Sequence, residues 1–172
     1  MLPDPIHPAI VHFPVVLAIL VPVAAVLALV LVERGAVSVR VGWGAVVGLA
    51  LLLTGSSWLA LETGEQQEER VERTVGEGPL DAHAARGQQF LAFAGVTLAL
   101  SAFGLARGRL GRGARAVGTV ATLALIPLGV RVGHSGGQLV YQHGAASAYT
   151  ATARGGQAAA VDEHESDEDH DH

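Results

Sequence analysis

The hydrophobic positions of this sequence fall into four long stretches that carry no charged side chain. They span residues 5–32, 41–61, 87–106 and 116–130. A helix that crosses a bilayer needs about 20 apolar residues, so the first three stretches are long enough by themselves. The fourth is shorter, but Arg115 and Arg131 at its ends can extend toward the membrane surface. A soluble bundle would show polar positions at helical spacing, and these stretches lack them.

This pattern predicts an all-α integral membrane protein, a four-helix bundle with up-down-up-down connections. We expect the helices at about 8–32, 41–62, 81–106 and 114–134, within a transmembrane domain of residues 1–144. The alternative is three spanning helices and a buried hairpin. We interpret residues 145–160 as a flexible linker and residues 161–172 as a disordered tail rich in acidic residues and histidine.

The distribution of arginine predicts the orientation of the bundle. The two short turns on one side hold six Arg against one acidic residue, Glu33; the six are Arg34, Arg40, Arg107, Arg109, Arg112 and Arg115. On the other side, acidic residues outnumber Arg in the 62–86 connection. Because short positive loops stay in the cytoplasm, we expect a multi-pass protein of the bacterial inner (cytoplasmic) membrane with both termini extracytoplasmic. Trp43 and Trp58, near opposite ends of the second helix, fit interfacial aromatic belts.

Composition narrows the possible functions. The chain of 172 residues contains no Cys, which excludes disulfides, cysteine-ligated iron–sulfur clusters and covalently attached c-type haem. The net charge of −5 comes from seven acidic residues in 161–172, since the rest sums to 11 − 9 = +2, and a nucleic-acid partner is not expected. The motif HExxH is absent, and no phosphate-binding loop is visible. An electron carrier or a subunit therefore fits better than a stand-alone enzyme.

Five histidines fall on the predicted extracytoplasmic side of the bundle. They are His7 and His12 at the start of the first helix, His83 at the start of the third, and His134 and His143 after the end of the fourth. Ionisable groups at membrane depth usually have a function, and neutral imidazole is the commonest metal ligand. The candidates are a bis-His haem b and a non-haem site for Zn, Ni or Cu(II). Arg131 or Arg86 could pair with haem propionates.

Each histidine also has a structural interpretation. His7 could cap the first helix, and the other four could be interfacial or hydrogen-bonding groups. His7 and His12 are five positions apart, about 140° around a helix, so they do not share a face. The tail histidines His164, His170 and His172 lie among carboxylates and could bind divalent metals weakly, or the tail could simply be solvated.

Two motifs resemble those of a known family. Residues 7–14, His-Pro-Ala-Ile-Val-His-Phe-Pro, resemble the HPxxVHFP opening of the domain-of-unknown-function 2231 family of small predicted membrane proteins. Residues 133–144 resemble the closing GHxGGxLVYxHG of that family, and His83 matches its internal histidine. The resemblance covers about residues 5–145. It implies a four-helix membrane domain whose signature includes all five histidines, in a family whose members occur joined to Rieske or cytochrome c modules.

Three functions follow as hypotheses. The first is a membrane protein that binds haem b through His12, His83, His134 and His143, with His7 as a further candidate, and transfers electrons at the periplasmic face to a separate cytochrome c, Rieske or quinone-linked partner. The second is a protein that binds or handles Zn, Ni or Cu(II) with the same histidines. The third is a non-catalytic subunit of a larger membrane complex, in which the histidines only pack or donate hydrogen bonds.

Overall fold

The structure is a computed structural model that describes residues 6–148 of the chain. These residues form helices and connecting turns, without a strand among them. A short helix, α1 (His7–Ile10), leads through Val11 into α2 (His12–Glu33), which is followed by α3 (Val39–Glu65). After α4 (Glu68–Val75), the long helices α5 (Glu77–Phe103) and α6 (Gly108–Tyr141) complete the fold. The all-α prediction is confirmed for this part of the chain.

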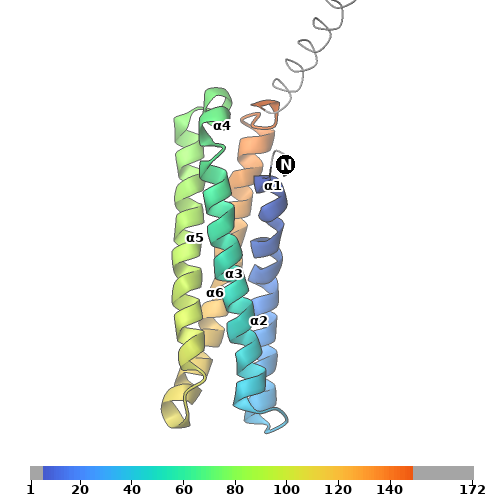
Figure 1. Ribbon diagram of the computed structural model, residues 1–172, viewed down its shortest axis with the longest axis vertical. Helices are drawn as coiled ribbons and strands as arrows, with labels where there is room; N and C mark the ends of the chain where they lie inside the picture. The colour runs from blue at the N-terminus through green and yellow to red at the C-terminus, as the bar shows by residue number, and fades with distance from the viewer. Residues whose placement is uncertain (1–5, 149–172) are drawn as a thin grey trace, which may run out of the picture.

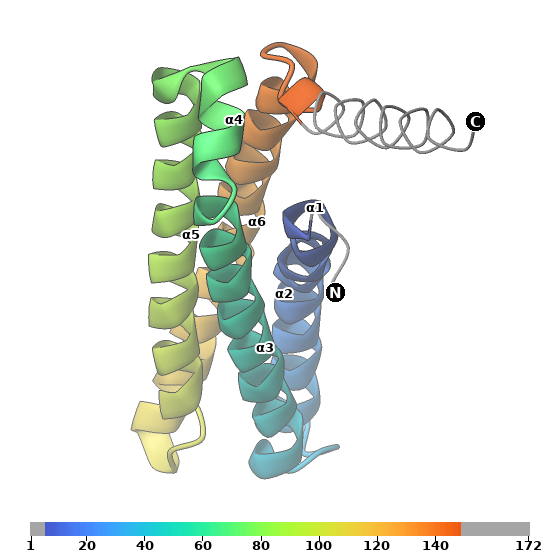
Figure 2. The ribbon, with the colours of Figure 1, turned by 45° about the horizontal axis from the view of Figure 1, so that its top comes forward.

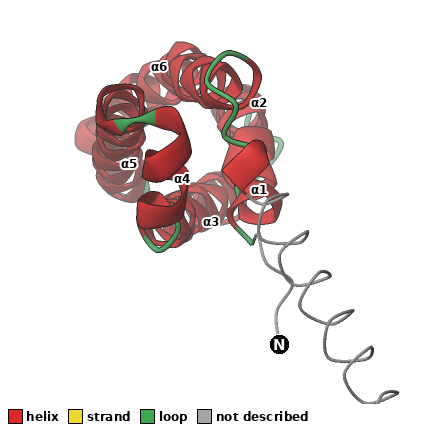
Figure 3. Ribbon diagram, turned by 90° about the horizontal axis from the view of Figure 1, so that it is seen from above, coloured by secondary structure: helices red, strands yellow, loops and turns green. Residues whose placement is uncertain are grey.

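The four long helices stand side by side in a ring (Figures 1 and 2). Contacts join α2 to α3, α3 to α5, α5 to α6 and α6 back to α2, so α2 and α5 lie on opposite sides of the ring (Figure 3). The chain is thus two helical hairpins, α2–α3 and α5–α6, connected by α4. The turns 34–38 and 104–107 lie at one end, called here the arginine end. The starts of α1 and α5 lie at the other, called here the histidine end.

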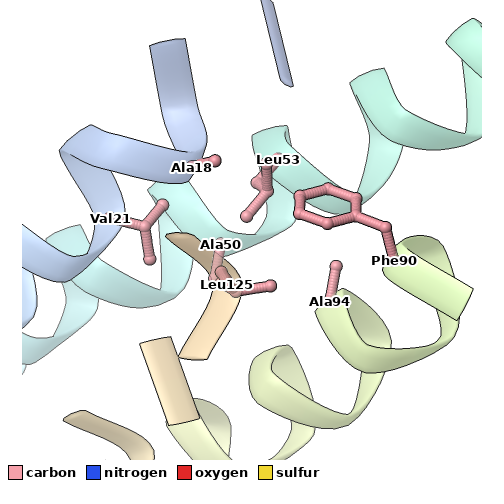
Figure 4. Packing of buried hydrophobic residues seen from close by; sticks show 7 residues of the cluster. All are labelled: Ala18, Val21, Ala50, Leu53, Phe90, Ala94 and Leu125. Atoms are coloured by element: carbon pink, nitrogen blue, oxygen red, sulfur yellow. The ribbon is translucent and has the colours of Figure 1, made fainter. Parts of the chain in front are cut away.

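The interior is built from small residues and a few larger ones. Its central cluster consists of Ala18, Val21, Ala50, Leu53, Phe90, Ala94 and Leu125 (Figure 4). Many larger aliphatic side chains point outward instead, among them Val15, Leu27, Leu51 and Val120, each more than half exposed. Small side chains inside allow close helix approach, and an apolar exterior suits contact with lipid tails. Three helical segments are long and apolar enough to cross a membrane: His7–Glu33, α3 and α6.

The observed helices differ from the expected ones mainly at the fourth, which was expected to begin at about 114 but begins at Gly108. The fourth helix was expected to end at 134, but α6 continues to Tyr141. The glycine-rich segment 133–137 is therefore helical; within it Ser135 is buried and Gly136 meets the His83 ring of α5. His134 accordingly lies within α6 and not after it. Most of the predicted linker, and the whole tail with His164, His170 and His172, lie outside the described residues.

The interpretation of Trp43 as a residue of a lipid-interface belt is wrong. Trp43 is fully buried, and its Nε1–H donates to the Ser101 carbonyl oxygen at 2.7 Å. Its indole packs against Gly104 and Gly118, positions at which a larger side chain would compete for the same space. Trp43 therefore connects α3 to both helices of the second hairpin. Trp58 is 54% exposed on the outside of the bundle.

Candidate functional site: two histidines at one end of the bundle

His7 enters the bundle from α1 and is held by the last turns of α3. Its Nδ1 lies 2.8 Å from the Ala60 carbonyl oxygen and 3.3 Å from the Thr63 hydroxyl. The ring rests on Gly64, where a Cβ would lie 3.2 Å from the ring's Cε1. The His7 side chain is partly buried. The N-cap residue of α1 is Ile6, and no side chain makes a capping hydrogen bond there. His7 is thus an inward-facing group, and it does not cap the helix.

His83 has the corresponding surroundings in the second hairpin. Its Nδ1 lies 2.9 Å from Oγ of Ser135 on α6, and its ring rests on Gly136, where a Cβ would lie 3.2 Å from Cε1. Each hairpin therefore sets one histidine, near the start of its first helix, against a hydroxyl and a glycine near the end of its second. The pairs are Thr63 with Gly64 and Ser135 with Gly136.

The hydrogen bonds determine which ring nitrogen carries the proton. The Ala60 carbonyl can only accept, so Nδ1 of His7 is the protonated nitrogen. The single Ser135 hydroxyl proton is donated to the Val132 carbonyl oxygen at 2.9 Å, so Ser135 accepts from Nδ1–H of His83. In a neutral imidazole the other nitrogen then holds a lone pair. Both histidines consequently have Nε2 available as a metal-ligand atom, in the state that metal-binding histidines adopt.

The two imidazoles are close enough to interact electrostatically. His83 precedes the charge-free stretch of α5, which begins at Gly87. Burial lowers the pKa of His83 below its ordinary value, and the positive charges of His7 and Arg86 act in the same direction. The neutral form of His83, the form that binds a metal, is therefore favoured near pH 7. His7 is held by α3 and His83, on α5, is held by α6, and α3 and α5 are neighbours in the ring of helices.

The other predicted histidines do not join this pair. His12 is exposed on α2, and its Nδ1 lies 2.7 Å from the Pro8 carbonyl oxygen one turn earlier. His134 is exposed on α6, next to the buried Ser135, and His143 is exposed after the end of α6. Arg86 and Arg131 are also exposed. Among residues 6–148, no group of three or more His, Asp or Glu side chains is gathered closely enough to hold a metal ion.

Sequence reasoning missed the residues that hold the two rings. Thr63, Gly64 and Ser135 were not singled out as parts of a site, although the repeated pair of a hydroxyl residue and glycine near the end of each hairpin was a usable signal. The sequence reasoning also ranked His7 below His12 as a candidate ligand. In the connecting helix α4, Val71 is buried in a cluster with Leu139 and Ala145.

Fold and site together define a helical membrane protein with a pair of inward-facing histidines at one end of its bundle. The match to a family model is consistent with this: residues 3–148 match the family described as "Predicted membrane protein (DUF2231)". The match covers well over half of the chain, so the protein belongs to this family. No curated protein and no solved structure matches the chain.

Proposed function

We propose that this protein binds haem b in the bacterial inner membrane, that His7 and His83 would hold it, and that the protein transfers electrons at the extracytoplasmic face. The observation that carries the proposal is the matching hydrogen bonding of the two imidazoles, each of which has its Nδ1 within hydrogen-bond distance of an oxygen on α3 or α6. Both are Nδ1-protonated by hydrogen bonding to α3 or α6, which leaves both Nε2 lone pairs free to ligate.

The chemistry of the donor set fits this cofactor. A haem iron takes four nitrogens from its own porphyrin and one or two axial ligands from the protein. Zinc sites, in contrast, need three or four protein ligands. Gly64 and Gly136 leave room for the two imidazole rings, because neither residue has a side chain. Cofactor sites in four-helix bundles are commonly built from side chains on facing helices, as here.

The roles of the chain's own residues follow from these contacts. When bound, a bis-His haem supplies a reversible one-electron couple at its iron. His7 and His83 would hold it, while Ala60 and Ser135 fix the orientation of the rings and raise their basicity through the Nδ1–H bonds. The central cluster around Phe90 and Leu125 keeps water away from the inner side. Arg86, three residues after His83 and exposed, is the better placed of the two propionate candidates.

The membrane arrangement is part of the same proposal. Three helices are apolar enough to span by themselves, and α5, which lies between two of them in the ring, is proposed as the fourth. The six Arg at the arginine end favour a cytoplasmic location for that end. The histidine end then faces the periplasm, where a separate cytochrome c, Rieske or quinone-linked protein could exchange electrons.

An absorption spectrum of the purified protein, with and without dithionite, tests the proposal. Protein from haem-replete cells should show a sharp α-band on reduction. His7→Ala and His83→Ala should each remove the low-spin bis-His spectrum, whereas His12→Ala and His134→Ala, matched changes of exposed histidines on the same hairpins, should retain it. A colourless wild type, or loss of the band only in the two control variants, would overturn the assignment.

The second candidate is binding of Zn, Ni or Cu(II), in which the same two Nε2 atoms would supply two of the ligands and the others would come from outside the pair. Imidazole suits all three ions, and both rings are already in the ligating tautomer. Elemental analysis of the purified protein separates the two. Stoichiometric Zn, Ni or Cu that is lost in His7→Ala and His83→Ala, with no Soret absorbance, would replace the haem proposal with this one.

A further inference from the structure

Five arginine side chains are exposed at the arginine end, opposite the histidine pair. They are Arg34 and Arg40, around the start of α3, and Arg107, Arg109 and Arg112, around the start of α6. We call these five residues the arginine rim. They come from both hairpins, so the rim is a property of the assembled bundle and not of one loop.

The single acidic residue in these turns does not neutralise the rim. Glu33 lies 3.8 Å from a terminal nitrogen of Arg115 and 3.9 Å from Nε of Arg112. Arg115 is a sixth Arg and is buried, and it donates to the Gly104 carbonyl oxygen at 2.8 Å. The negative charge of Glu33 therefore compensates the positive charge of the buried Arg115. Counting the six Arg and the one Glu, the arginine end has a net charge of 6 − 1 = +5.

Large apolar side chains are exposed directly beside the rim. Leu110, between Arg109 and Arg112, is 70% exposed, and Val41, next to Arg40, is 67% exposed. Phe103 and Val117 continue this apolar surface along α5 and α6. A surface with cations at the helix ends and bare apolar side chains beside them matches a phospholipid, with a phosphate next to acyl chains.

We infer that the arginine rim binds the headgroups of anionic phospholipids. Charge complementarity selects the negative headgroup, and guanidinium groups bind phosphate by paired hydrogen bonds. The apolar surface beside the rim selects a phosphate that carries acyl chains over free inorganic phosphate. This inference does not depend on a cofactor at the histidine end.

The test uses the full chain in mild detergent, titrated with phosphatidylglycerol, phosphatidylcholine or inorganic phosphate and read by native mass spectrometry. Wild type should retain phosphatidylglycerol in preference to phosphatidylcholine and should not retain phosphate. Each Arg near an anionic surface contributes about a fivefold gain in binding, so Arg109→Gln with Arg112→Gln should weaken phosphatidylglycerol binding by about 25-fold. The matched control is Arg73→Gln with Arg131→Gln, which removes two exposed Arg elsewhere and should change binding little.

Three results would overturn the inference. They are equal binding of phosphatidylglycerol and phosphatidylcholine, equal losses in the two double variants, and binding of inorganic phosphate as tight as that of the lipid. Retained thermal stability of both double variants in detergent confirms that they fold, so a loss of lipid binding in one of them is interpretable.

Discussion

Nδ1 of His83 on α5 lies 2.9 Å from Oγ of Ser135 on α6, although 52 positions separate the two residues in the chain. The Ser135 hydroxyl donates in turn to the Val132 carbonyl oxygen, so the acceptor role of Ser135 toward His83 is fixed by its own backbone. These two hydrogen bonds, which we call the Ser135 relay, place the proton of a neutral His83 on Nδ1. The His7 bond to the Ala60 carbonyl does the same in the other hairpin.

Ser135→Ala removes the acceptor for Nδ1–H of His83 and should weaken the cofactor site without unfolding the bundle. Loss of such a partner to a ligating histidine typically costs about 10–100-fold in affinity, and we expect a loss in this range. Haem titration followed at the Soret band measures it. Ser101→Ala, a matched loss of a buried hydroxyl on the far side of the core, should leave the affinity unchanged. Equal losses in the two variants would contradict the relay.

Gly136→Ala should disturb the His83 ring directly, because the added Cβ would lie 3.2 Å from its Cε1. Gly133→Ala on the same helix is the control, since a Cβ there meets nothing within 4 Å. Ala is favoured over Gly in a helix by about 1 kcal/mol, so Gly133→Ala should raise the thermal midpoint in detergent. Gly136→Ala should raise the thermal midpoint less than Gly133→Ala does, and it should also alter the cofactor spectrum. If the two variants behave alike, the ring does not rest on Gly136.

Gly104→Ala should destabilise the bundle strongly. A Cβ at this position would overlap Nε1 of Trp43, which is buried and bonded to the Ser101 carbonyl. Overpacking of a filled core typically costs about 1–3 kcal/mol, and loss of the indole hydrogen bond adds to this. Gly95→Ala, within the helix α5 that Gly104 follows and with open space at its Cβ position, serves as the reference. Thermal unfolding of both in the same detergent gives the comparison, and equal midpoints would show that Trp43 packs elsewhere.

The two tryptophans should respond differently to lipid-borne quenchers. Trp58 is 54% exposed on the outer surface, while Trp43 has no exposed surface. In vesicles with brominated acyl chains, the Trp43→Phe variant, which retains Trp58, should lose most of its fluorescence. The Trp58→Phe variant, which retains Trp43, should lose little. Strong quenching of Trp43 would restore its interpretation as an interfacial residue.

The sequence determined that the chain forms long apolar helices and which residue types gather at each end. A charge-free stretch that is long enough to cross a bilayer forms a helix, because every backbone N–H and C=O group in the lipid must be hydrogen-bonded within the segment. The same stretches predicted the placement of arginine at one end and of His7 and His83 at the other. The extension of α6 through residues 133–141 was missed, since glycine and serine usually indicate a turn in sequence.

Only the tertiary structure decided which side chains face inward. In a membrane bundle both the lipid-facing and the core-facing sides are apolar, so hydropathy does not distinguish them, and a shift of one residue rotates a side chain by about 100°. The packing between the helices distinguishes them instead. Trp43 is buried where Gly104 and Gly118 leave space for its indole. His83 lies where Gly136 leaves space for its ring and where the Ser135 hydroxyl accepts its hydrogen bond. His12 and His134, equally prominent in the sequence, are exposed on α2 and α6, and Nδ1 of His12 lies 2.7 Å from the Pro8 carbonyl oxygen one turn earlier.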